Sequence, residues 1–424
     1  MARILRYALL VVGGFTAGLV LAAPTVETYS NFATGFGSGT VLDSELVAAA
    51  AAAIVAVLVA TWIRRRSTTA AVIAAGAVLV GGIASPGAWP FDLYLAVTGA
   101  GLILGGLAAS TTRSSLPHLR AQTALTAGTV AGLQLAEPLR NYRQLSLSPR
   151  QYVSFMVASS GATNLVWLAL AGITGLLATA VYCIRSESVP KLQRDPHGRD
   201  LVVGIGLPVV AVGLFWSLHQ ALGTRAEAPE NGLWLLGVLV VPIAVTAALW
   251  LPGRRGMIVL AAIAVIAVSH PEDSPWRPTD PPWLLVPVLL TAAGVWAGRR
   301  WPHTLLGPSM LALVAISAAF TAPPWDNLHG ATLTLLFPLA TGYIFTSTLP
   351  SSAPVTTTAL ALPATMSVPL TMQLGWASYI PVTDLDPGWA DRNYSGIAAA
   401  VSTAAVLVCG ASMAWLRHRR PHTP

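Results

Sequence analysis

The chain has 424 residues, of which 54% are hydrophobic and only 10% are charged, and its formal net charge is +7. An average soluble domain carries about 25% charged residues, so this composition excludes a water-soluble globular protein and requires lipid as the solvent. It also excludes a nucleic-acid-binding role for the positive charge, because the basic residues gather at the ends of apolar segments.

Apolar runs of spanning length occur fourteen times and predict an all-α polytopic membrane protein. They cover residues 7–23, 46–63, 70–85, 93–109, 121–137, 164–184, 201–222, 233–251, 256–269, 284–298, 304–321, 331–346, 356–375 and 396–416. The first run resembles a signal peptide, but Pro24 disfavours cleavage after Ala23, so we expect a retained helix. The ninth run is short, which leaves a re-entrant segment as the alternative to a span.

Charge asymmetry predicts the orientation. If the N-terminus is cytoplasmic and the spans alternate, 18 of the 24 basic residues and only 3 of the 17 acidic residues fall inside. The inner segments then carry a net charge of +15 and the outer segments −8. Because inner loops of membrane proteins are rich in Arg and Lys, we expect both termini to be cytoplasmic, in the plasma (inner) membrane of a bacterium.

Three landmarks recur along the chain and predict an internal duplication. "STTRSSLP" at 110–117 agrees with "STLPSSAP" at 347–354 in five of eight positions. The inner loop "WIRRRST" is matched by "AGRRWPH", and the outer loop "AWPFDLY" by "PPWDNLH". Each pair is eight spans apart, an even number, so the repeat is parallel. Spans 1–6 pair with spans 9–14, and spans 7 and 8 are an inserted pair.

The repeat predicts three domains. Residues 1–185 form an N-terminal six-helix bundle, 186–252 a cytoplasmic linker with the inserted pair, and 253–424 a C-terminal six-helix bundle.

The layout of six, two and six spans resembles the fourteen-helix branch of the major facilitator superfamily. The loops "ATWIRRRSTT" and "AGVWAGRRWPH" resemble that family's motif Gly-x-x-x-Asp-Arg-x-Gly-Arg-Arg, although neither has its aspartate. The resemblance implies a central cavity lined by the first, second, fourth and fifth helices of each half. It also implies a gating role for the loop arginines Arg64, Arg65, Arg66, Arg299 and Arg300.

Polar stripes along the fifth and thirteenth spans are the candidate substrate site. One face of the fifth span carries Thr123, Thr126, Gln134 and Glu137, and one face of the thirteenth carries Thr358, Thr365, Gln373 and Trp376. We predict that Gln134, Gln373, Thr126, Thr365, Glu137 and Trp376 bind substrate. The alternatives are that the amides only hydrogen-bond between helices, and that Glu137 is an interfacial carboxylate paired with Arg140.

The predicted function is transport. Every charged residue falls in a loop or at a span end, which argues against a deep proton relay and favours a neutral, amphipathic or lipid-like small molecule. The eight histidines are scattered, so no metal or other cofactor is predicted. The expected partners are membrane lipid, the substrate, and possible protein contacts at the acidic outer face. The alternatives are a non-transporting scaffold or accessory subunit and, less favoured, a membrane-embedded glycosyl or lipid transferase, so we do not expect an enzyme.

Overall fold

The computed structural model is helical throughout its regular elements. It describes residues 2–34, 45–63, 65–82, 92–112, 117–146, 160–183, 198–224, 238–269, 281–320, 323–325, 327–375 and 387–419. Each of the fourteen apolar runs overlaps a helix in these ranges, which confirms the predicted all-α fold.

The helices form two sets of six separated by a pair. The first set, the N-half, is α1 (Ala2–Thr34), α2 (Glu45–Trp62), α3 (Arg66–Gly82), α4 (Asp92–Thr111), α5 (His118–Ser146) and α6 (Ser160–Cys183). The pair is α7 (Gly198–Thr224) and α9 (Val240–Trp250). The second set, the C-half, is α10 (Gly256–Ile266), α11 (Leu285–Arg300) after the 3-10 turn η4 (Pro281–Leu284), α12 (Leu306–Ser317), one composite helix, α15 (Ala353–Gly375) and α16 (Pro387–Arg419). The composite helix joins α13 (Leu328–Ala331), the π-helical segment η5 (Thr332–Leu336) and α14 (Phe337–Ser347).

Helix packing repeats between the two halves. In the N-half, α1 contacts the three helices α4, α5 and α6. In addition, α2 contacts α4, while α3 contacts both α4 and α6. In the C-half, α10 contacts the three helices α14, α15 and α16. In addition, α11 contacts α14, while α12 contacts both α14 and α16. Each of these N-half contacts has its counterpart eight spans later, in the same chain order. The predicted parallel repeat is therefore confirmed.

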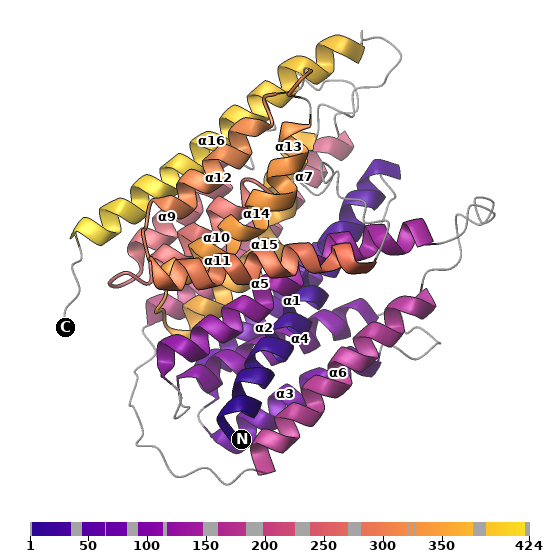
Figure 1. The fold of residues 1–424 in the computed structure, drawn as a ribbon, viewed down its shortest axis with the longest axis vertical. Helices are drawn as coiled ribbons and strands as arrows, with labels where there is room; N and C mark the ends of the chain where they lie inside the picture. The colour runs from indigo at the N-terminus through magenta and orange to yellow at the C-terminus, as the bar shows by residue number, and fades with distance from the viewer. Residues whose placement is uncertain are drawn as a thin grey trace.

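The first residues of α1 and the last residues of α16 lie at one end of the bundle (Figure 1). We refer to it as the arginine-rich end, where α2, α11 and α16 finish and α5, α7, α10 and α15 begin. Hydrogen bonds join these elements there, including one from Arg254, before α10, to the carbonyl of Arg417 in the last turn of α16 (3.3 Å). The alternation of spans predicted from the charges thus brings the described arginine clusters to the same end.

Glycines let α1 and α5 cross at backbone contact. Gly14 and Gly18 of α1 face α5 so closely that an added Cβ would overlap its carbonyl oxygens, that of Thr129 among them. Gly128 and Gly132 of α5 face the α1 backbone in the same way. A spacing of four residues keeps each pair on one helix face. Close packing of this kind drives helix association in lipid, where burying apolar side chains gains little.

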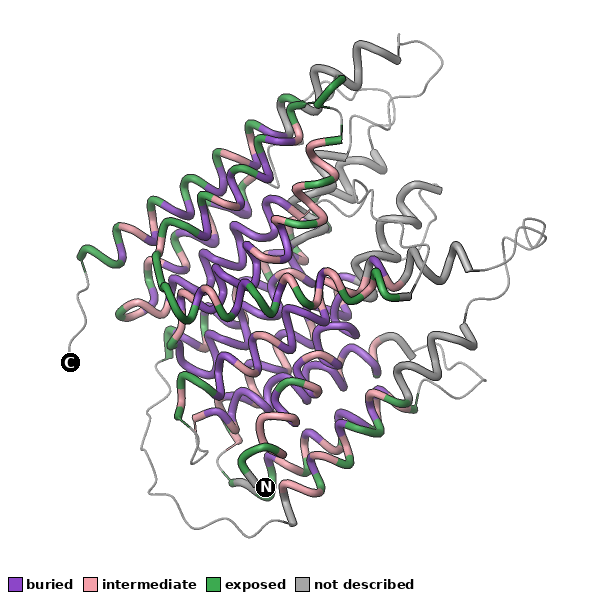
Figure 2. Tube along the Cα trace, viewed as in Figure 1, coloured by how far each residue is buried: buried purple, intermediate pink, exposed green. Residues whose placement is uncertain are grey.

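Burial separates central helices from lipid-facing ones (Figure 2). All eleven residues of α10 are buried, which explains how so short a helix can be apolar on every side. By contrast, α11 exposes Leu285, Leu289 and Trp296, each more than half accessible. Within the described residues, six helices are long and apolar enough to cross a membrane by length and composition, and further apolar helices are shorter. The exposed apolar surface identifies a multi-pass membrane protein.

Candidate functional site between the two halves

The two halves meet along helices that correspond in the repeat. α2 packs against α15, and α5 packs against α11. Because α2 corresponds to α11 and α5 to α15, these two contacts are equivalent. Both helices that carry the predicted polar stripes, α5 and α15, therefore lie at the interface between the halves.

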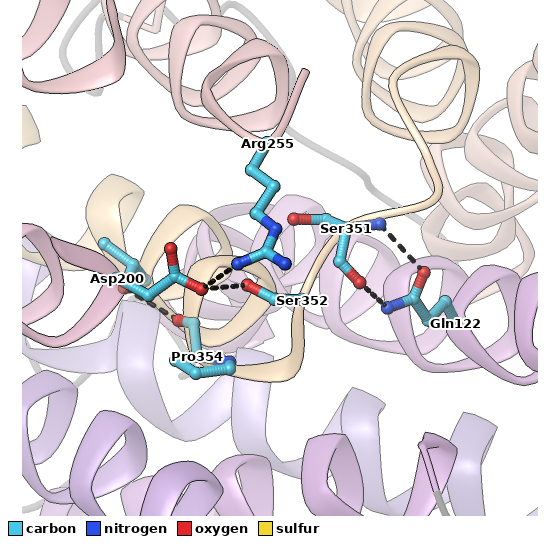
Figure 3. Close-up of polar contacts among 7 residues, drawn as sticks. Gln122, Asp200, Arg255, Ser351, Ser352 and Pro354 are labelled. Carbon is cyan, nitrogen blue, oxygen red and sulfur yellow. Dashed lines mark hydrogen bonds and ion pairs between the residues drawn. The ribbon is translucent and has the colours of Figure 1, made fainter. Parts of the chain in front are cut away.

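At the arginine-rich end, Gln122 joins the halves. It lies in the first turns of α5, and its Nε2 donates to the carbonyl oxygen of Ser351, just before α15 (2.5 Å). The backbone N–H of Ser351 donates in return to Gln122 Oε1 (3.2 Å). Both residues are buried. We call this pair of hydrogen bonds the Gln122–Ser351 closure (Figure 3).

A buried carboxylate lies beside this closure. Asp200, in the first turn of α7, is 2% exposed. Its Oδ2 accepts from Arg255 Nη1 (2.7 Å) and from Ser352 Oγ (2.8 Å), as Figure 3 shows. Its Oδ1 and the hydroxyl of Ser351 are buried and have no hydrogen-bond partner among the described residues. Asp200 thus ties the inserted pair to the C-half next to the contact between the halves.

Further contacts brace this end. Arg417 Nη1 donates to Thr304 Oγ1 (3.0 Å), which joins α16 to the start of α12. The guanidinium of Arg199 lies 5.5 Å from the ring centroid of Trp250, which joins α7 to α9. These contacts lie within the C-half or within the inserted pair. They stabilise the parts on either side of the interface without crossing it.

Within the described part of the chain, the predicted gating arginines do not take part in the contacts of Asp200 and Gln122. Arg65, Arg299 and Arg300 are exposed at the arginine-rich end, and the ion pair found there uses Arg255 instead. Arg64 and the side chain of Arg66 lie outside the described part of the chain. Their gating role stays a prediction.

Nearer the middle of α5, Gln134 forms a second hydrogen bond between the halves. Its Nε2 donates to Thr341 Oγ1 of α14 (3.4 Å), and the side chain is half-buried. Thr126 is fully buried, and its hydroxyl has no hydrogen-bond partner among the described residues. Thr365 is buried too, but its hydroxyl donates to carbonyls of its own helix, including that of Leu362 (3.2 Å). Thr126 and Gln134 therefore keep hydrogen-bonding capacity that Thr365 spends on its own helix.

Three further residues belong to the predicted site. The side chains of Gln373 in α15 and Glu137 in α5 lie outside the described part, as does Trp376 entirely. Their roles in substrate binding stay predictions.

Sequence reasoning missed the closure. In the sequence, Asp200 is one of the three acidic residues of the inner segments, and Ser351 and Ser352 belong to the repeated loop 347–354, and neither pattern predicts that they meet. Gln122 begins the polar face that continues through Thr126, four residues on, so the stripe could have been extended by one turn. Its partner could not have been named, because 229 residues separate Gln122 from Ser351.

No protein-family model and no curated protein matches the sequence. Among solved structures, the chain is similar to the proton:xylose symporter XylE of the major facilitator superfamily bound to 6-bromo-6-deoxy-D-glucose. The TM-score is 0.53 at 13% identity, covering 97% of this chain and 95% of that chain. It is also similar to an auto-inhibited peptide transporter of the POT family, with a TM-score of 0.51 at 14% identity over 99% and 98% of the two chains. The chain is similar to tetrameric PepTSo2 as well, with a TM-score of 0.50 at 13% identity over 98% of each chain.

These similarities cover nearly the whole of each chain. Because the sequence identity is only 13–14%, they show the fold alone. They agree with the repeated helix contacts, with the resemblance seen in the loop sequences, and with a multi-pass membrane protein. The chain has the fold of the major facilitator superfamily transporters.

Proposed function

We propose that the chain is a membrane transporter that moves a neutral or amphipathic small molecule between its two halves by alternating access. In such a cycle the interface opens to one side of the membrane while it is closed to the other. The observation that carries the proposal is the Gln122–Ser351 closure, in which two repeated half-bundles are joined at one end by reversible hydrogen bonds.

The strength of this closure suits a cycle. A hydrogen bond inside a protein contributes about 0.5–1.5 kcal/mol net, so two of them contribute about 1–3 kcal/mol. Two-state proteins whose conformations differ by a few kcal/mol keep both populated, and a ligand that prefers one state shifts the balance. The closure is therefore strong enough to define a state and weak enough to be opened by binding.

Polar groups at the interface favour an uncharged substrate. Asp200 is the only charged residue among the buried described side chains, and Arg255 neutralises it. The groups nearer the middle of α5 are the hydroxyl of Thr126 and the amide of Gln134. Amides and hydroxyls can donate to and accept from a neutral partner, whereas an ion at membrane depth is usually met by charged groups. A sugar, a neutral peptide or a lipid-like compound fits this chemistry.

Orientation completes the proposal. The positive-inside rule puts the arginine-rich end in the cytoplasm. The hydrogen-bonded closure is then the cytoplasmic gate, and the structure corresponds to a state closed toward the cytoplasm. We place the protein in the bacterial plasma membrane on the same grounds.

Reconstitution tests the function. The purified full chain would be placed in proteoliposomes and offered radiolabelled D-xylose, a neutral dipeptide and a lysophospholipid in turn. We expect saturable movement of at least one of them into the vesicles. A panel in which nothing moves, and nothing changes the thermal stability of the protein, would favour the scaffold alternative. Chemical conversion of a panel member would favour the transferase.

A further inference from the structure

Helix α7 of the inserted pair lies across the seam between the two halves. It packs against α2 of the N-half and against α15 of the C-half. At Gly204 the three helices meet, since an added Cβ would lie 2.7 Å from Val57 of α2 and 2.9 Å from Thr358 of α15. α7 is therefore in contact with both parts that must move relative to each other in a transport cycle.

The two contacts of α7 differ in chemistry. Toward α2, it presents the backbone of Gly204 to the apolar side chain of Val57. Toward the C-half, the carboxylate of Asp200 is held by Arg255 and by Ser352, at 2.7 Å and 2.8 Å. Charge-assisted hydrogen bonds are directional and strong, whereas an apolar contact has no preferred register. The charge-assisted hydrogen bonds of α7 are therefore made to the C-half.

Ser351 and Ser352 connect this attachment to the contact between the halves. The hydroxyl of Ser352 binds Asp200, and the peptide of Ser351, the preceding residue, binds Gln122 of the N-half. Consecutive Cα atoms are about 3.8 Å apart, so a shift of Ser352 moves the Ser351 peptide with it. Figure 3 shows Asp200, Ser352, Ser351 and Gln122 in one continuous row.

We propose that Asp200 is a positioning residue for the closure. The inserted helix α7 travels with the C-half, and its carboxylate holds the segment Ser351–Ser352 where Gln122 can bind it. The inserted pair thereby sets how readily the arginine-rich end opens. The purpose of this opening rests on the proposed function, but the coupling itself is a property of the structure and can be measured without a substrate.

A buried reporter measures the opening. Thr126 is 0% exposed and lies one turn beyond Gln122 on the same face of α5. In a full chain with Cys183→Ser and Cys409→Ala, Thr126→Cys would react with fluorescein maleimide only when the arginine-rich end opens. We expect Asp200→Ala and Ser352→Ala each to raise the labelling rate about twofold to tenfold, the population shift that one lost hydrogen bond allows. Gln122→Leu, which removes the partner in the N-half, should do the same.

A double variant separates positioning from general destabilisation. If Asp200 acts through Ser351 on Gln122, then Asp200→Ala added to Gln122→Leu should change the labelling rate by less than about twofold, because coupled residues are not additive. A residue that only stabilises the fold would multiply the rate again. The matched control is Arg417→Gln, which breaks a hydrogen bond to Thr304 at the same end but within the C-half. It should leave the labelling rate unchanged.

The proposal is overturned if Asp200→Ala and Ser352→Ala leave labelling at the rate of the parent, or if the double variant shows the full product of the two effects. If Asp200→Ala does not yield folded protein, Ser352→Ala still removes the hydrogen bond between the two residues. The labelling rate of Ser352→Ala then tests the proposal by itself. Because labelling needs no substrate, a protein that moves no solute can still confirm the coupling. Conversely, a protein that transports a solute refutes the coupling if Asp200→Ala and Ser352→Ala leave its labelling rate unchanged.

Discussion

Gln122 and Ser351 are 229 residues apart in the chain, and each donates a hydrogen bond to the other across the two halves, over 2.5 and 3.2 Å. One partner offers a side-chain amide and the other its peptide group. A primary amide carries a donor and an acceptor side by side, so it can satisfy both the N–H and the C=O of one residue. The identity of Gln122 therefore matters to this contact, whereas the side chain of Ser351 does not take part in it.

Cross-linking this pair should hold the arginine-rich end shut. In the chain lacking native cysteines, Gln122→Cys with Ser351→Cys should form a bridge with a short bifunctional thiosulfonate reagent. A protease site inserted after residue 190 allows the two halves to be separated on a denaturing gel unless they are bridged. We expect bridged halves from this pair that fall apart on reduction. Ser67→Cys, exposed near the start of α3, should give no bridge to Ser351→Cys.

Alanine at Gly18 should destabilise the N-half. The new Cβ would overlap the carbonyl of Thr129 in α5, and neither backbone can move away without separating the helices. Overpacking of this kind costs about 1–3 kcal/mol. The measurement is the midpoint of thermal unfolding in detergent, which should fall.

Gly172 of α6 is the matched control for that change. An added Cβ there meets nothing within 4 Å. Because alanine is a better helix former than glycine by up to about 1 kcal/mol, Gly172→Ala should leave the midpoint unchanged or raise it. Equal losses at both positions would show that close crossing of α1 and α5 is not what Gly18 provides.

Leucine at Gln134 should separate substrate binding from helix packing. The substitution removes the amide and so breaks the bond to Thr341. Thr341→Val breaks the same bond from the other side. If Gln134 binds substrate, Gln134→Leu should weaken binding about twofold to tenfold per lost hydrogen bond, while Thr341→Val leaves affinity unchanged. Affinity would be read by scintillation proximity with the solute that the reconstitution identifies.

Packing alone would give another pattern. Between membrane helices such a bond contributes about 0.6 kcal/mol, so both variants would then lower the thermal midpoint equally and leave affinity unaffected. The affinity measurement applies equally to Gln373→Leu, since the predicted role of Gln373 is symmetric with that of Gln134.

Thiol labelling in intact cells should establish the orientation. Ser67 and Trp325 are both exposed, and they lie at opposite ends of the bundle. With the arginine-rich end in the cytoplasm, Trp325→Cys should react with a membrane-impermeant maleimide and Ser67→Cys should react only after permeabilisation. Cys409 should not react in either case while the protein is folded, since it is fully buried. The reverse pattern for the two introduced cysteines would invert the proposed topology.

Much of the architecture follows from local patterns. Each helix needs only an apolar run of sufficient length, and its neighbours in sequence supply that information. The repeat was visible because loops such as 110–117 and 347–354 keep similar residues at the same place in each half. The contacts of α10 with α15 and of α1 with α5 then follow from one packing scheme used twice.

The contacts that join the halves had no such signal. Asp200 pairs with Ser352, 152 residues away, and with Arg255, 55 residues away, although Arg199 is its neighbour in sequence. Which arginine meets a carboxylate depends on how α7 packs against α15 and on where the start of α10 lies, and periodicity along one helix does not contain that information. Likewise, Thr126 and Thr365 share a stripe pattern, but only packing and local hydrogen bonds show that Thr365 binds its own helix. The sequence by itself determined a membrane protein with repeated helices and a charged end, because hydropathy and charge act residue by residue. Only the tertiary structure decided which polar groups meet across the interface, because that depends on the docking of distant helices.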